Sequence, residues 1–139
     1  MILLDTNVIS EVMLPLPDRR VAHWLDLQPR SSVWTTSITV YEIRSGLLAM
    51  PAGKRRTVLE SRFDQLLQSA LQSRILHFDS DAALRAAELC AGRRRQGRPV
   101  DARDTMIAGI VLASHAKLAT RNVRHFEDIA ASVVNPWEP

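Results

Sequence analysis

Residues 1–7, MILLDTN, place three aliphatic residues directly before an acid. The run Ile2–Leu4 is short and continuously apolar, which is typical of a strand buried on both faces of a parallel sheet. Asp5 then stands at the carboxyl end of that strand, where the chain turns polar. Taken alone, such an acid is explained by an Asx turn or by the cap of the next helix. A functional role for Asp5 requires other acids at the same edge of the sheet.

Short apolar strands alternate with amphipathic helices along the rest of the chain. The patterns predict strands at 33–36, 74–78, 117–120 and 133–134, and helices at 7–13, from Asp18, from Thr39, at 54–72, from Asp79 or Asp81 to 96, at 102–115 and at 125–131. This alternation predicts an α/β fold, a three-layer α/β/α sandwich with a short parallel sheet of four to five strands. The carboxyl ends of such strands and the following helix N-termini line one crevice.

The bulk composition predicts one globular domain spanning 1–139. The chain has 139 residues, of which 46% are hydrophobic and 24% charged, so it can bury a core. No apolar stretch is long enough to span a membrane, and Asp5 interrupts any amino-terminal signal sequence. The single cysteine cannot form an internal disulfide, which is consistent with the cytoplasm.

The net charge of +3 is concentrated in a few basic segments. One contains Arg93, Arg94, Arg95 and Arg98, a second is 54–56, and Arg121 and Arg124 lie near the carboxyl end. Each segment is explained either by a polyanionic partner or by cations that match the negative end of a helix dipole. Phosphate binding is favoured if an acidic, metal-holding site lies nearby.

Three acids are predicted to reach the crevice. Asp5 ends the first strand, Glu42 lies in the first turn of the helix that follows the second strand, and Asp104 begins the helix before the fourth strand. Each also has a structural explanation. Thr39 and Glu42 fit a capping box, and Asp101 and Asp104 favour a helix N-terminus electrostatically.

Three carboxylates in one pocket repel one another. At about 4 Å and an effective dielectric constant near 20, each pair costs roughly 4 kcal/mol. Either protons or a cation must compensate for this repulsion. Oxygen ligands without histidine or cysteine favour Mg²⁺ or Mn²⁺, which can activate water and stabilise a leaving oxygen at a phosphodiester.

Four segments occur together in an order that resembles a known family. They are LLDTNVIS, TSITVYEIRSG, DARDTMIAGIVLA and LATRNVRHF, and a closing NPW follows them. Together they resemble PIN-domain ribonucleases of the VapC toxin type, and the length and the NPW are most similar to the FitB-like branch. The resemblance covers essentially the whole chain.

The resemblance implies a Mg²⁺- or Mn²⁺-dependent endoribonuclease that cleaves RNA. It further implies a homodimer paired with a small DNA-binding antitoxin of the VapB or FitA kind. Asp5, Glu42 and Asp104 then match the metal-binding, catalytic acids. Thr6, Asn7 and Thr120 match polar supporting positions, and Asn122 stands where many members carry a fourth acid. An amide there still accepts a hydrogen bond but brings no negative charge.

Other positions receive weaker expectations. Arg121 and the arginines Arg93, Arg94, Arg95 and Arg98 are expected to contact either the RNA backbone or antitoxin acids. The four histidines are expected to be structural or exposed. A different class of function also fits the sequence: a PIN-like module with little or no catalysis that binds antitoxin and nucleic acid.

Overall fold

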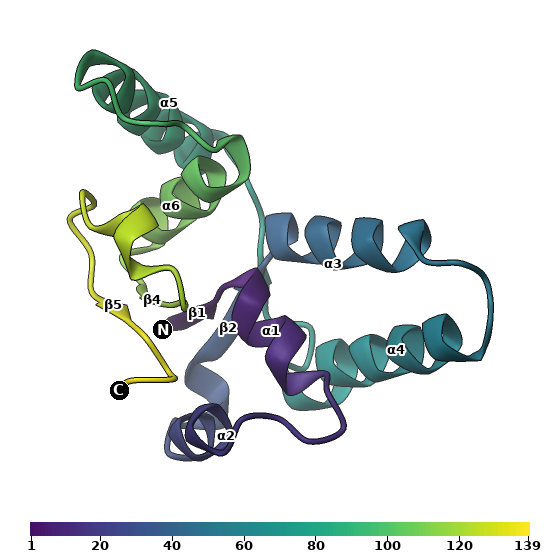
Figure 1. Cartoon of the computed structure of the whole chain (residues 1–139). Helices are drawn as coiled ribbons and strands as arrows, with labels where there is room; N and C mark the ends of the chain where they lie inside the picture. The colour runs from purple at the N-terminus through teal and green to yellow at the C-terminus, as the bar shows by residue number, and fades with distance from the viewer.

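A computed structural model describes residues 1–139 as a five-stranded parallel sheet with helices on both faces (Figure 1). The strand order is β3-β2-β1-β4-β5, and every neighbouring pair is parallel. The predicted three-layer α/β/α sandwich is therefore confirmed. No helix is both long and apolar enough to cross a membrane.

The elements agree closely in position with the sequence patterns. The strands are β1 (Ile2–Leu4), β2 (Val33–Thr36), β3 (Ile75–Leu76), β4 (Lys117–Ala119) and β5 (Val133–Val134). The α-helices are α1 (Thr6–Val12), α2 (Arg19–Asp26), α3 (Ser37–Ala49), α4 (Lys54–Gln65), α5 (Ser80–Arg95) and α6 (Ala102–Ser114). Three short helical turns complete the chain: η1 (Arg30–Ser32), η2 (Leu66–Ala70) and η3 (Val123–Phe126).

The central strand β1 contributes to a hydrophobic core on each face of the sheet. Ile2 and Leu4 join one core, whereas Leu3 joins the other, because successive side chains of a strand point to opposite faces. The first core lies with α1, α2 and α3, and the second with α6. The expectation that this strand is buried on both faces is confirmed.

The strand order creates a topological switch point between β1 and β4. The chain leaves β1 toward β2 and β3 on one side, while β4 and β5 extend the sheet on the other. Open parallel sheets bind ligands at such a point, outside the carboxyl ends of the strands. The first residues after β1 and β4, Asp5 and Thr120, lie at this point.

The start of α3 differs from the prediction. Thr36 is the N-cap, because its hydroxyl accepts a hydrogen bond from the backbone N–H of Thr39 at 3.1 Å. Thr39 is therefore inside the helix, and Glu42 lies in the second turn rather than at the third position of a capping box. The capping-box explanation of Glu42 is wrong.

Three other elements are shorter than the sequence patterns predict. The helix expected at 54–72 ends at Gln65 and continues as the π-helical turn η2. The helix expected at 125–131 is instead the short 3₁₀ turn η3. The third strand is confined to Ile75–Leu76, within the predicted 74–78.

Helices α5 and α6 pack closely through small side chains. Gly109 of α6 faces Ala82 and Ala86 of α5, and a Cβ atom at Gly109 would overlap the Ala82 carbonyl oxygen and lie 2.8 Å from the Ala86 Cβ. Gly109 therefore allows α6, which carries Asp104 in its first turn, to approach α5.

Gly109→Ala is expected to lower the free energy of unfolding by about 1–3 kcal/mol, the usual cost of overpacking a core. Gly46→Ala is the matched control. Gly46 lies within α3 with open space around it, so alanine there is expected to stabilise the protein by roughly 0.5–1 kcal/mol. Urea denaturation measures both changes. Equal effects of the two substitutions would contradict the close-packing assignment.

Candidate active site

Asp5 combines a structural contact with a position in the crevice. Its Oδ1 accepts a hydrogen bond from the backbone N–H of Thr6 at 2.7 Å and so caps α1. Its Oδ2 accepts from the Thr120 hydroxyl at 2.7 Å. The residue is only 4% exposed. Asp5 therefore both caps α1 and lies in the candidate site.

The Thr120 hydroxyl is fixed in orientation by its partners. It accepts hydrogen bonds from the Asn7 side-chain amide at 3.3 Å and from the Asn122 backbone N–H at 3.1 Å. A hydroxyl has one hydrogen to donate, and Asp5 receives it. This contact joins the segments that follow β1 and β4.

Asn7 closes the same junction from the other side. Its side-chain amide donates to Thr120 and, at 3.4 Å, to Asp5 Oδ2. Its Oδ1 accepts the backbone N–H of Arg121 at 3.0 Å. The amide nitrogen and the amide oxygen of Asn7 therefore both connect the start of α1 to the segment after β4.

Glu42 reaches the crevice from α3. Its Oε1 accepts a hydrogen bond from the Thr6 hydroxyl at 2.8 Å, and its Oε2 lies 3.5 Å from the Arg103 guanidinium. Thr39 lies 3.2 Å from the same Thr6 hydroxyl. The carboxylate thus faces α1 and α6 rather than its own helix backbone.

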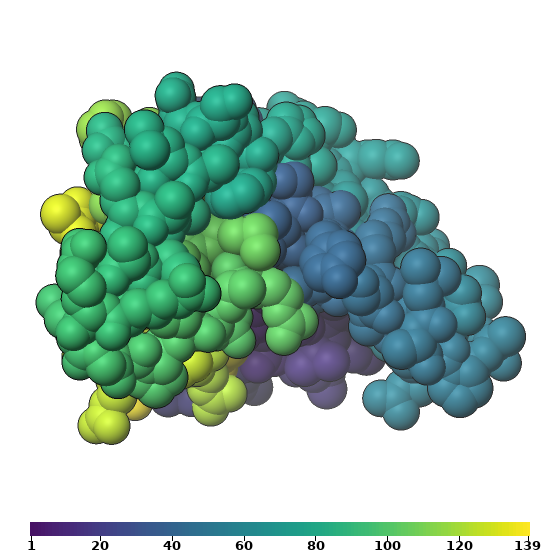
Figure 2. Space-filling view, turned by 90° about the horizontal axis from the view of Figure 1, so that it is seen from above, coloured from purple at the N-terminus to yellow at the C-terminus, as the bar shows by residue number.

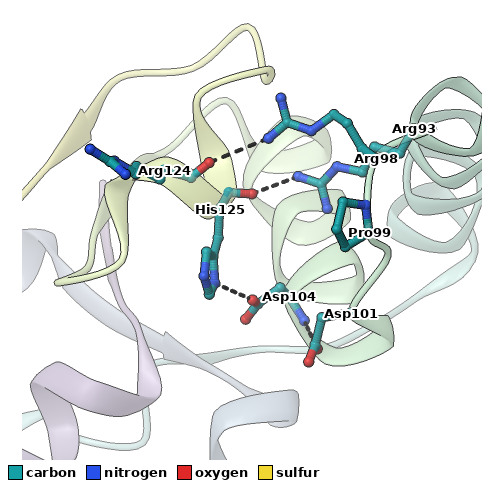
Figure 3. A pocket seen from close by; sticks show the side chains of 7 residues that line it. All are labelled: Arg93, Arg98, Pro99, Asp101, Asp104, Arg124 and His125. Atoms are coloured by element: carbon teal, nitrogen blue, oxygen red, sulfur yellow. Dashed lines mark hydrogen bonds and ion pairs between the residues drawn. The ribbon is translucent and has the colours of Figure 1, made fainter. Parts of the chain in front are cut away.

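Asp104 lies in the first turn of α6, three residues after the N-cap Asp101. Asp101 accepts the backbone N–H of Asp104 at 3.0 Å, which confirms its expected role at the helix start. The Asp104 carboxylate is therefore not needed to cap the helix. Its Oδ2 lies 2.8 Å from His125 Nδ1 (Figure 3).

A cleft of about 230 Å³ opens beside Asp104 (Figure 3). Most of the lining residues are charged; they are Arg93, Arg98, Pro99, Asp101, Asp104, Arg124 and His125. In the close-up, His125 and Asp104 point toward each other across it, whereas the Arg124 side chain points away. The cleft is charged and continuous with one of the three acids.

Arg93, one of the predicted RNA or antitoxin contacts, is buried at 4% exposure. Its Nε and Nη2 donate to the two oxygens of Asp128, each at 2.9 Å, and Nη1 donates to Thr105. Nη2 also donates to the carbonyl oxygen of His125 at 2.8 Å. The hydrogen bond to Arg93 lowers the pKa of Asp128. Arg93 is thus committed to holding η3 against α5 and α6.

The remaining predicted cations lie at the surface. Arg94 and Arg95 are exposed, and Arg98 is half-buried with its guanidinium 3.5 Å from Glu127. Arg121 is exposed, with its guanidinium 4.9 Å from the centre of the Trp137 ring. These side chains, unlike that of Arg93, face solvent.

The Asp5 carboxyl has a perturbed pKa. Burial raises the pKa of Asp5 to about 6, against the opposing effect of the hydrogen bonds from Thr120 and Thr6. The negative charges of Asp104 and Glu42 raise it further. The three predicted acids are therefore close enough to interact electrostatically.

The acids do not form a ready-made cluster of three metal ligands. One oxygen of Glu42 lies 3.5 Å from the Arg103 guanidinium, and one oxygen of Asp104 lies 2.8 Å from the His125 imidazole. The donors nevertheless fit a hard divalent cation, because all three are carboxylates and Thr6 and Thr120 add hydroxyl oxygens around them.

Two residues that the sequence patterns do not assign to the site, Arg103 and His125, contact its acids. Arg103 precedes Asp104 directly, and His125 follows Thr120 within the segment LATRNVRHF, so nearness to predicted site residues was the available signal. The position of η3 decides the His125 contact, and that position depends on the buried Arg93. Asn122 contributes its backbone N–H, while its side chain is exposed.

Comparisons with known proteins agree with this geometry. The model of the PIN domain family matches residues 2–132, and the chain therefore belongs to the PIN domain family. The chain is 43% identical to VapC ribonuclease Y4jK of Sinorhizobium fredii, over 100% of this chain and 99% of the relative. It is 37% identical to Toxin FitB of Neisseria gonorrhoeae, over 99% of each chain.

Solved structures show the same fold. The crystal structure of FitAcB from Neisseria gonorrhoeae matches with a TM-score of 0.90 at 37% identity, covering 100% of both chains. DNA-bound VapBC from Salmonella typhimurium matches with a TM-score of 0.75 at 26% identity, covering 97% of both chains.

The raised pKa of Asp5 predicts a specific pH dependence of stability without metal. The folded protein binds the Asp5 proton more tightly than the unfolded chain, whose pKa is near 3.8. The stabilising contribution is complete below that value and is lost as pH rises through about 6. A shift of roughly two units corresponds to about 3 kcal/mol.

Asp5→Asn removes this titration while keeping the shape of the side chain. In EDTA, the free energy of unfolding of the variant relative to the wild type is expected to rise between about pH 4 and pH 7. Denaturant titrations at several pH values give this difference. A difference that stays constant with pH would show that Asp5 is not a buried, perturbed carboxyl group.

Proposed function

We propose that this protein is a metal-dependent endoribonuclease and the toxin of a toxin–antitoxin pair. The observation that carries the proposal is the convergence of Asp5, Glu42 and Asp104 on the switch point of a parallel sheet, with Asp5 buried among like charges. The names of the relatives, a VapC ribonuclease and a toxin, support the reaction and the biological role.

The three acids would hold the divalent cation, Mg²⁺ or Mn²⁺. Such an ion, when bound, polarises a phosphodiester and lowers the pKa of a bound water for in-line attack. Asp5 is the least mobile of the three ligands, because Thr6, Asn7 and Thr120 hold both of its oxygens. The Thr6 hydroxyl holds Glu42 toward the same point.

The basic side chains at the rim have complementary roles. Arg103 offsets the charge of Glu42 in the metal-free protein, and His125 forms a hydrogen bond with Asp104; both side chains are more than half exposed. When a cation and a phosphate bind, these side chains are free to turn toward the phosphate oxygens. The exposed arginines Arg94, Arg95 and Arg121, together with the half-buried Arg98, would add electrostatic attraction for RNA.

The partner proposed for the chain is a small DNA-binding antitoxin of the VapB or FitA kind. This rests on the structural neighbours, which include VapBC and FitAB complexes, three of them described as DNA-bound. A homodimer is proposed as well. Exposed apolar side chains on α3 and α5, Tyr41, Leu48 and Leu84, are available for such an interface. The cytoplasm, where RNA is accessible, is the proposed location.

RNA cleavage by the purified protein with Mn²⁺ tests the reaction. Asp5→Asn and Asp104→Asn are each expected to reduce the rate by more than about 100-fold, because changes in groups that only support metal ligands cost roughly 10–100-fold. EDTA is expected to abolish cleavage. Gel electrophoresis of labelled RNA measures the rate.

Asp101→Asn is the matched control. It removes a carboxylate three residues from Asp104, but asparagine is an equally good N-cap, so α6 is preserved. This variant is expected to cleave at close to the wild-type rate. Equal rates for wild type, Asp5→Asn and Asp104→Asn would reject the nuclease assignment at this site. RNA and antitoxin binding without cleavage would favour the non-catalytic module instead.

A further inference from the structure

Arg121 is an exposed arginine whose guanidinium lies over an aromatic ring. Arg44 also lies over a ring, that of Phe63, but its guanidinium is ion-paired with Asp64. The Arg121 guanidinium carbon lies 4.9 Å from the centre of the Trp137 ring, which is a cation–π arrangement. No carboxylate lies within ion-pair distance of this guanidinium. We propose that Arg121 and Trp137 form a stacking platform for an unpaired nucleobase of the RNA strand.

The platform is rigid on its inner side. Trp137 is only 5% exposed, and its backbone N–H donates to the Asn135 side chain at 2.9 Å. The segment before it is β5, which pairs with β4 through Ala119 and Val134. The indole is therefore anchored to the sheet, and the Arg121 side chain covers it as an exposed outer layer.

The backbone of Arg121 is fixed at the candidate active site. Its N–H donates to Asn7 Oδ1 at 3.0 Å, and the same Asn7 side chain donates to Asp5. Arg121 also follows Thr120 directly, whose hydroxyl is bonded to Asp5. A base on this platform would thus belong to a nucleotide adjacent to the one whose phosphate meets the acids.

The chemistry of arginine suits a base on the outer face. The guanidinium is planar and weakly hydrated, so its two faces can stack on aromatic groups at once. Single-stranded RNA is commonly held by bases stacked on aromatic rings or on arginine planes. Because Trp137 already restricts the side chain, little rotamer freedom remains to be lost on binding.

This inference rests on the proposed function, since it assumes that RNA is the ligand. The test distinguishes binding of the nucleobase from binding of the sugar-phosphate backbone of the RNA. Binding is measured in EDTA by fluorescence anisotropy with an oligoadenylate of about eight nucleotides, within the roughly 4–16 that single-strand sites cover. The comparison is an abasic oligomer with the same sugar-phosphate backbone.

The wild type is expected to bind oligoadenylate at least about fivefold more tightly than the abasic oligomer, the lower end of the stacking contribution of one base. Arg121→Ala is expected to remove most of this preference. Arg121→Lys is expected to remove it too, because lysine keeps the charge and loses the plane. Both changes are at an exposed side chain, and circular dichroism verifies the fold.

Arg124→Ala is the matched control, since Arg124 is exposed, equally charged and not packed on an aromatic ring. It is expected to weaken binding of both oligomers equally. A base preference that survives Arg121→Lys would show that the base is bound elsewhere and would overturn the proposal, as would an equal loss of the preference in Arg124→Ala. Absence of RNA binding by the wild type would reject the proposed function as well. Cleavage of RNA without any base preference would reject the platform alone.

Discussion

The hydrogen bond from Thr120 to Asp5 is the contact on which the site depends. It connects the residue after β1 to the residue after β4, across the point where the strand order reverses. Both groups are buried, and the two lone pairs of the hydroxyl accept N–H groups while its one hydrogen is donated to Asp5. A buried carboxylate is costly unless it is hydrogen-bonded, so the order of the strands and the chemistry of the crevice are linked at this bond.

The remaining parts of the site follow from how other elements approach that bond. Asp5 caps α1, and the hydroxyl of Thr6 at the start of α1 donates a hydrogen bond to Glu42 of α3. The close contact of α5 with α6 positions the first turn of α6, and buried Arg93 positions η3 beside it. Viewed from above, α5 and α6 lie to one side and α3 and α4 to the other, with the amino-terminal segment visible between them (Figure 2). These contacts bring three acids that are far apart in sequence close enough to interact electrostatically.

The sequence predicts what local patterns determine. The apolar run before Asp5, the alternation of strands and helices, and the caps at Asp18, Asp79 and Asp101 all agree with the structure. Patterns could not choose between Thr36 and Thr39 as the cap of α3, since both are threonines near the strand end. They also could not distinguish Arg93 from its neighbours, because only the packing of α5 buries one arginine of a basic run. The pairing of His125 with Asp104 depends on that same packing.

In the proposed site, Asp5, Glu42 and Asp104 hold a divalent cation with carboxylates that otherwise repel one another. Equilibrium binding of Mn²⁺, followed by electron paramagnetic resonance of the free ion, tests it without reference to any substrate. The wild type is expected to bind one Mn²⁺ tightly per chain, and to release protons on binding near pH 6, since Asp5 is partly protonated there. Glu42→Gln is expected to weaken this binding, whereas Asp101→Asn is expected to leave it unchanged. Binding that is absent in the wild type, or unaffected by Glu42→Gln, would contradict the account.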